Sequence, residues 1–224
     1  MRQIIKSIAA KVPYSVYDRC RAWSVMDQNF RFQLLRAKEL DSREALWRHL
    51  LSSIGAKERV LLLEFGVYNG YSIHQFASMN ANQSSKFIGF DSFEGLPEDW
   101  TPQCPKGTFS QSGQLPPVRD NRITLVKGWF SDTLIPYLHE IESQDRITVC
   151  HFDADLYSST LFCLTTLLQK LRRFYFIFDE FSGHEARALC DVMQAYPIQV
   201  SFLAHTGERY PDQVSGELTN QTKI

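Results

Sequence analysis

Acidic residues end four apolar segments of this 224-residue chain. Each segment has the length and composition of a buried strand. In an open α/β sheet, ligands bind beyond the carboxyl ends of the strands, and neighbouring strand ends lie about 5 Å apart. The acids therefore fall where chemistry is expected, and they are Glu64, Asp91, Asp153 and the adjacent pair Asp179 and Glu180.

Three of these carboxylates are expected to converge on one point. Asp153 closes the segment 146–153, and Asp179 and Glu180 close the segment 173–179. Carboxylates this close repel one another, and a hard divalent cation with oxygen ligands is a suitable partner. The sequence thus predicts a Mg²⁺ site at Asp153, Asp179 and Glu180. The alternative is that Asp179 and Glu180 are solvated loop acids and that Asp155 simply caps the next helix.

The segment 60–70, VLLLEFGVYNG, has the form of a strand followed by a tight turn. Gly66 and Gly70 allow the backbone to turn sharply and to approach a ligand. A second strand ends in Asp91 about twenty residues later, which is the layout of a nucleoside-binding domain whose acid accepts hydrogen bonds from ribose hydroxyls. The glycine spacing is not G-x-G-x-x-G, so a dinucleotide enzyme is a weaker alternative.

Several other side chains are candidates for binding or proton transfer. Trp129 and Phe130 follow the strand 122–127 and are able to stack on a flat base. His184 follows the last acidic pair and either faces a substrate or lies at the surface, whereas His74 and His151 are interpreted as packing residues. The chain has no G-x-S-x-G elbow and no P-loop motif, which argues against a serine hydrolase and a P-loop enzyme.

Hydrophobic periodicity predicts one α/β domain. Residues 1–57 are predicted to form a helical extension, with a capping box at Asp41 to Glu44 and helices over 31–40 and 46–54. From residue 58 to 224, strands and helices alternate, which indicates a mostly parallel sheet covered on both faces. Predicted strands are 59–65, 86–91, 122–127, 146–153, 173–179, 198–204 and 212–218; predicted helices are 70–80, 131–141, 157–171 and 182–195. The turn residues at 206–207 and 211–212 predict a late hairpin, which suits a sheet with one antiparallel edge strand. The segment 92–117 is too long for an ordinary loop and is predicted to act as a lid, with Phe93, Trp100 and Phe109.

Composition limits the possible partners and compartment. The net charge of −1 gives no electrostatic footprint for nucleic acid. Five dispersed cysteines and no recognisable signal peptide favour a reducing, cytoplasmic location, with Cys150 and Cys163 as buried thiols. No apolar run is long enough to insert stably in a membrane. The N-terminal helices are a possible contact between copies of the chain.

Six motifs in this order resemble the macrocin-O-methyltransferase (TylF/MycF-type) family, whose members use S-adenosylmethionine (SAM). They are EFGVYNG at 64, FDSFEGLPEDW at 90, KGTF at 106, GWFSDTL at 128, DADLYSST at 153 and FDEF at 178. The resemblance implies a Rossmann-like class I methyltransferase fold with a seven-stranded sheet, and methyl transfer to a hydroxyl of a sugar or natural product, often with Mg²⁺. This chain departs from the family pattern at Ala154, where glycine is usual, and at Glu180, where aspartate is usual.

When the family's functional positions are matched to this sequence, the resemblance implies roles for most of the site residues. Glu64, Gly66 and Gly70 would form the SAM turn together with Val67, Tyr68 and Ser72. Asp91 and Ser92 would lie near the ribose and adenine, and Trp129 and Phe130 near the adenine. Asp153 would contact both cofactor and metal, and either Asp153 or His184 would be the general base. The alternatives are a methyltransferase that needs no metal and a non-catalytic module that binds SAM or a nucleoside.

Overall fold

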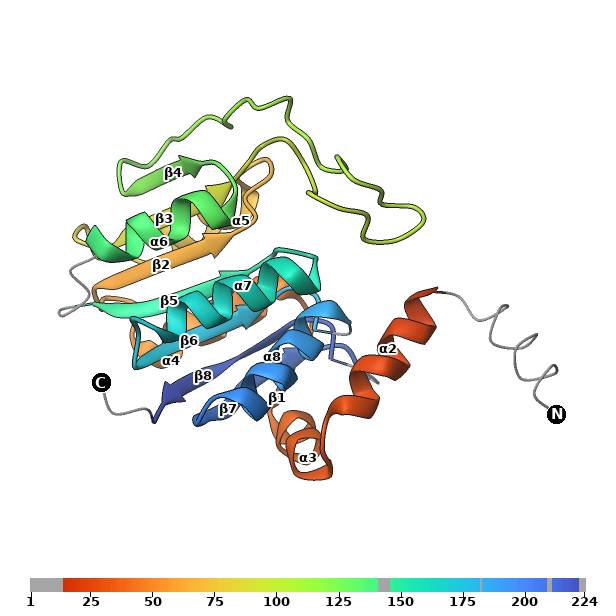
Figure 1. The fold of residues 1–224 in the computed structure, drawn as a ribbon. Coiled ribbons are helices and arrows are strands. Elements are labelled where there is room, and N and C mark those ends of the chain that lie inside the picture. Colours follow the sequence, from red (N-terminus) through yellow and green to blue (C-terminus); the bar gives the residue numbers. More distant parts are fainter. Residues whose placement is uncertain (1–13, 141–145, 182, 209–210, 222–224) are drawn as a thin grey trace, which may run out of the picture.

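The protein is described here by a computed structural model, which places residues 14–140, 146–181, 183–208 and 211–221 (Figure 1). Its centre is an eight-stranded sheet with the order β1-β7-β8-β6-β5-β2-β3-β4. The strands are β1 Lys38–Leu40, β2 Val60–Phe65, β3 Lys86–Asp91, β4 Ile123–Lys127, β5 Ile147–Phe152, β6 Arg173–Phe178, β7 Ile198–Thr206 and β8 Val214–Asn220. The helices are α2 Tyr14–Val25, α3 Gln28–Arg36, α4 Arg43–Ile54, α5 Tyr71–Met79, α6 Phe130–Glu140, α7 Tyr157–Leu168 and α8 His184–Ala195.

The sheet is mostly parallel, as the alternation of elements predicts. Strands β4, β3, β2, β5 and β6 run in one direction, and β8 is antiparallel to both β6 and β7. The predicted hairpin between β7 and β8 is confirmed, but its antiparallel strand β8 lies between β7 and β6 and not at the edge of the sheet. Because the parallel strands share a direction, their carboxyl ends form one edge, and the predicted site residues follow these ends.

Helices cover both faces of the sheet (Figure 1). Helices α6, α7 and α8 pack on one face, and α4 and α5 pack on the other. The buried side chains of β2 alternate between these two cores, with Phe65 on the first face and Leu62 on the second. Phe65 stacks on Phe152 at 5.3 Å, and Phe152 on Phe178 at 4.8 Å between ring centroids. Burial on both faces explains why these strands are uninterrupted apolar segments.

The N-terminal extension differs from its prediction. The stretch 31–40 is not one helix, because α3 ends at Arg36 and Lys38–Leu40 forms β1, parallel to the end of β7. The sheet therefore has eight strands rather than seven. Without β1, the outer side of β7 would be an open sheet edge with unpaired backbone groups, and a short segment can satisfy them without a strong sequence signal.

Helix α4 begins one residue later than the predicted capping box implies. Ser42 is the N-cap, and its hydroxyl accepts the backbone N–H of Ala45 at 3.2 Å. Asp41 does not fill this position. The predicted contact between copies of the chain stays a prediction; Phe32 and Leu35 of α3 are exposed.

The predicted lid, 92–117, contains no helix and one isolated bridge, between Thr101 and Cys104. It folds back on itself through two backbone hydrogen bonds of 2.9 Å that link Leu96 with Gly107 and Thr108. Figure 1 shows this segment arching beyond the carboxyl ends of the central strands. Cys150 and Cys163 are buried free thiols, as expected. Within the described ranges, no helix has both the length and the apolar character needed to cross a membrane.

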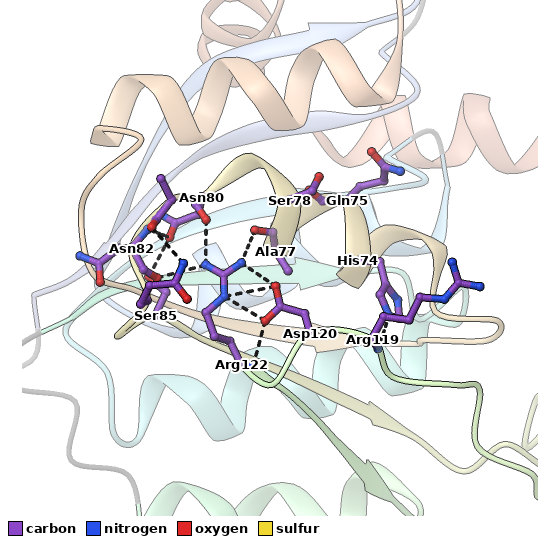
Figure 2. Close-up of polar contacts among 12 residues, drawn as sticks. His74, Gln75, Ala77, Ser78, Asn80, Asn82, Ser85, Arg119, Asp120 and Arg122 are labelled. Carbon is purple, nitrogen blue, oxygen red and sulfur yellow. Dashed lines mark hydrogen bonds and ion pairs between the residues drawn. The ribbon is translucent and has the colours of Figure 1, made fainter.

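Arg122, at the start of β4, ties the end of helix α5 to its surroundings (Figure 2). Its guanidinium donates to the carbonyl oxygens of Ala77, Asn80 and Asn82 at 2.6, 2.8 and 3.1 Å. It also pairs with the Asp120 carboxylate at 2.7 Å. Carbonyls at the end of a helix have no partner within the helix, so Arg122 supplies donors that α5 lacks.

Candidate active site

A cavity of about 490 Å³ opens at the carboxyl ends of the central strands. Eight residues predicted for the site line it: Gly66, Tyr68, Asp91, Ser92, Trp129, Phe130, Asp153 and Glu180. Six others do not line it: Glu64, Val67, Gly70, Ser72, Asp179 and His184. The shared edge of the sheet therefore brings together most, but not all, of the predicted set.

Gly66 lies where two strand ends touch. Its φ is +97°, and a Cβ built on it would lie 1.9 Å from the carbonyl oxygen of Asp153. No side chain fits between the backbones at this distance, so the approach of β2 to the end of β5 requires glycine. Gly70 also has a positive φ, +80°, and is the N-cap of α5.

Asp91 organises the turn after β2. Its Oδ2 accepts the backbone N–H groups of Val67 and Tyr68, both at 2.8 Å, and its Oδ1 accepts that of Phe93 at 2.7 Å. The carboxylate thus joins the glycine turn to the start of the lid. Two carboxylate oxygens offer about four acceptor positions, so one is left for a ligand on the cavity side.

Glu64 and Ser72 lie beneath the cavity rather than in it. The Glu64 side chain is fully buried, and its Oε1 accepts the Ser72 hydroxyl at 2.6 Å. Its Oε2 lies 3.8 Å from Nδ1 of the buried His151. These two residues therefore fix helix α5 against β2 and do not contact a ligand in the cavity, which differs from the direct cofactor contact predicted for them.

Aromatic rings form the walls of the cavity on the lid side. Tyr68 and Phe109 meet edge to face, with centroids 5.8 Å apart, and join the glycine turn to the lid. Trp129 and Phe130 line the cavity after β4. Phe93 is buried in the core instead, with an exposed fraction of 1%, so only part of the predicted lid contact is present.

The opposite end of the cavity is acidic. Asp153, Asp155 and Glu180 line it. Burial and the neighbouring Asp179 carboxylate raise the pKa of Asp153 to about 8. Burial and the Asp153 carboxylate raise the pKa of Asp155 to about 9. Asp155 does not cap α7: the N-cap is Leu156, and Asp155 has a strained positive φ of 58°.

Asp179 lies between two cationic side chains. Its Oδ2 is 3.7 Å from Nη1 of Arg43, and its Oδ1 is 3.9 Å from Nε2 of His151. Burial opposes protonation of His151, but Asp179 and Glu64 outweigh it and raise the His151 pKa to about 10. Asp179 therefore has two basic side chains of the chain, Arg43 and His151, within 4 Å.

The predicted metal donors do not fit a metal ion as they are arranged. Across the part of the chain that the structure describes, no group of three or more His, Cys, Asp or Glu side chains is placed to hold one. Asp179 points toward Arg43 and His151 and does not line the cavity, while Asp153 and Glu180 do. The three metal ligands that the resemblance implies therefore do not face one point: Asp153 and Glu180 line the cavity, and Asp179 does not.

The two histidines that flank the site have structural contacts. Nδ1 of His184 lies 3.2 Å from the backbone N of Tyr157 and accepts its hydrogen at the start of α7, away from the cavity lining. This position does not support the predicted role of His184 as a base. His74 contacts the carbonyl of Gly70 through Nδ1 at 2.7 Å, and its Nε2 accepts the N–H of Arg119 at 3.3 Å. It is a packing residue, as interpreted from the sequence.

A family model described as "Methyltransferase domain" matches residues 63–178, which is more than half of the chain. The chain belongs to this methyltransferase family. The matched range runs from β2 to β6 and contains the glycine turn, the lid and Asp153. The finer likeness to macrocin-O-methyltransferases stays a prediction. No curated protein sequence matches the chain.

Solved structures share the fold of this methyltransferase. The calicheamicin methyltransferase CalS11 is similar with a TM-score of 0.55 and 20% identity, over 99% of this chain and 91% of that one. The O-methyltransferase NovP is similar with a TM-score of 0.54 and 21% identity, over 81% and 80%. The Podospora anserina methyltransferase PaMTH1, bound to S-adenosylhomocysteine (SAH), is similar with a TM-score of 0.51 and 13% identity, over 98% and 96%. The Rossmann-like methyltransferase fold is therefore confirmed.

Sequence reasoning missed several lining residues of the methyltransferase. Arg43 comes from α4, far from the motifs, and nothing in its local sequence indicates the cavity. Asp155 precedes a helix, so its sequence position favours a cap over a place in the cavity. The remaining lining residues that were not assigned to the site are small or apolar, and they are Gly95, Leu96, Pro97, Gly128, Ser131, Ala154, Ser158, Ser159 and Phe162.

Proposed function

We propose that this protein transfers the methyl group of SAM to a hydroxyl group of a small molecule, such as a sugar or another natural product. One observation carries the proposal: a single cavity is lined by Gly66, Asp91 and Trp129, which end or follow β2, β3 and β4, and by the acids Asp153 and Glu180, which follow β5 and β6. Its volume of about 490 Å³ lies within the range of roughly 300–1,000 Å³ that is common for small-ligand pockets. PaMTH1 has the same fold and binds SAH, and NovP is named as an O-methyltransferase, which supports the choice of cofactor and acceptor atom.

The nucleoside of SAM would bind at the end of the cavity formed by Asp91 and the aromatic residues. The remaining acceptor position of Asp91 would receive a ribose hydroxyl. Trp129 and Phe130 would stack against the adenine. Gly66, where a side chain has no room, would let the methionine portion approach the backbone between β2 and β5.

The acceptor hydroxyl would bind at the acidic end, next to Asp153. The hydroxyl oxygen attacks the methyl carbon, the C–O bond forms, and the C–S bond breaks with its electron pair moving to sulfur. The hydroxyl proton passes to a carboxylate, for which Asp153 is our choice because it lines the cavity beside Gly66. The rate gain comes largely from holding the oxygen in line with the methyl group. No step requires a metal ion.

Two measurements test the proposal. Calorimetry should show SAH binding, and labelled SAM should pass its methyl group to one member of a panel of sugar nucleotides, phenols and polyketides. Asp153→Asn should keep SAH binding and lose turnover, whereas Asp191→Asn in α8, outside the cavity lining, should keep both. SAH binding without transfer to any acceptor would favour a non-catalytic SAM-binding module, and binding of NAD instead would contradict the proposal.

A further inference from the structure

An arginine lines the same cavity as Asp153 and Glu180, two of the residues that the family resemblance implies as Mg²⁺ ligands. Arg43 is the first residue of α4, and it reaches the cavity that Asp153 and Glu180 line. Its Nη1 lies 3.7 Å from Oδ2 of Asp179. The predicted metal ligands thus have a resident cation beside them.

We propose that the Arg43 guanidinium takes the place of the divalent metal in this enzyme. It neutralises Asp179 and presents N–H donors to the acceptor oxygen. The role of Arg43 in catalysis rests on the proposed methyl transfer. The central claim is separate: it states which cation occupies the acidic end of the cavity. A cation held there by the chain makes the site independent of added metal.

Neighbouring side chains hold Arg43 in this position. The guanidinium carbon lies 5.3 Å from the centroid of the Trp47 ring and 5.5 Å from that of Tyr71. The Nε atom lies 3.5 Å from Oε1 of Glu44, and the same oxygen accepts the Tyr71 hydroxyl at 3.1 Å. Two aromatic faces and a second carboxylate therefore restrict the side chain, as cation–π and ion-pair contacts do at built sites.

The burial of Asp179 shows why a cation is needed. The exposed fraction of this residue is 7%, and a carboxylate with so little solvent requires a charged partner or hydrogen bonds. On one side the buried His151 supplies positive charge, and on the cavity side Arg43 supplies it. A metal ion bound to Asp179 would have to displace Arg43 from this contact.

The guanidinium can assist the reaction without exchanging a proton. It carries five N–H donors and keeps its charge at any working pH. Donation to the acceptor oxygen favours the developing negative charge while the proton moves to the carboxylate and the methyl group moves to oxygen. Arg43 begins and ends the reaction fully protonated, so the atoms and charges of the transfer balance without a further reactant.

The test is a Mn²⁺ titration followed by electron paramagnetic resonance, combined with SAH calorimetry. The proteins are the wild type, Arg43→Gln, Arg43→Lys and the control Arg48→Gln, which changes an exposed arginine of the same helix. We expect the wild type, the lysine variant and the control to leave Mn²⁺ free. We expect Arg43→Gln to bind one Mn²⁺ per chain, because without the guanidinium the Asp179 carboxylate is free to turn toward Asp153 and Glu180, and to bind SAH with nearly unchanged affinity.

Each other result overturns the inference. One bound Mn²⁺ in the wild type would show that the metal site exists despite Arg43. No bound Mn²⁺ in Arg43→Gln would show that the arginine does not occupy a metal's place. Loss of SAH binding in this variant would assign Arg43 to the cofactor. With an acceptor from the panel, Arg43→Gln should lower turnover by on the order of 100-fold, with partial rescue by lysine and no effect of EDTA on the wild type.

A failure of the proposed function is distinguishable from a failure of this inference. If the wild type binds no SAH, the proposed function is wrong, whereas the Mn²⁺ titration still decides which cation occupies the acidic end.

Discussion

Arg122→Met should destabilise the protein strongly, although the residue is far from the reacting atoms. The change removes the donors to the carbonyls of Ala77, Asn80 and Asn82 and leaves the Asp120 carboxylate without its partner (Figure 2). The Arg122 side chain is only 9% exposed, so water replaces these donors poorly. Hydrogen bonds to charged groups contribute about 1.5–3 kcal/mol each and are not additive. We expect a loss of about 3 kcal/mol in the free energy of unfolding.

Urea unfolding and thermal melting measure this loss. A chain of this size shifts its Tm by roughly 2–4 °C per kcal/mol, so the expected decrease is about 6–12 °C. The matched control is Arg173→Met, because Arg173 also pairs with a carboxylate, Glu217 at 2.6 Å. Both arginines lie over an aromatic ring, which is Phe87 for Arg122 and Tyr175 for Arg173. The Arg173 side chain is 61% exposed, and the expected loss is below about 1 kcal/mol. Equal losses in the two variants would refute the argument that burial decides the contribution.

The ion pair between Arg122 and Asp120 predicts a pH dependence of the stability. Hydrogen bonds from Arg122 lower the pKa of Asp120 from 3.8 to about 2. A carboxyl whose pKa is lower in the folded state stabilises the fold fully above pH 3.8, and its contribution disappears as the pH falls toward 2. The difference in stability between the wild type and Arg122→Met should therefore narrow over this interval. A difference that stays constant through it would contradict the assigned pKa.

Three substitutions test the cofactor end of the cavity, each measured by SAH calorimetry with circular dichroism as a check of folding. Gly66→Ala should abolish binding, because its Cβ would meet the Asp153 carbonyl at 1.9 Å, whereas Gly107→Ala, with nothing within 4 Å, should bind normally. Asp91→Asn should weaken binding by about tenfold or more, since an amide has a single acceptor oxygen for the three backbone N–H groups now bound by the carboxylate. Trp129→Ala should weaken it by about tenfold through loss of stacking. Unchanged affinity in any of the three would remove that residue from the proposed cofactor site.

The fold was largely predictable because the patterns that indicate helices and strands lie within short stretches of the sequence. Apolar segments that alternate with helical periodicity indicated the parallel sheet, and the hairpin before β8 followed from turn residues. The strand β1 escaped prediction because its three residues carry no periodicity and gain their structure by pairing with β7. The helix cap at Ser42 instead of Asp41 shows how weakly local sequence fixes a boundary.

By itself, the sequence determined that acids and glycines stand at the carboxyl ends of parallel strands, because strand direction follows from the order of elements along the chain. It thereby placed Gly66, Asp91 and Asp153 at one site. Only the tertiary structure decided where each side chain points: Glu64 is buried beneath the cavity, and Asp179 faces Arg43, which lies far from it in the sequence. The physical reason is that a side chain's partners are set by packing between elements, and the spacing of residues along a strand does not encode that packing.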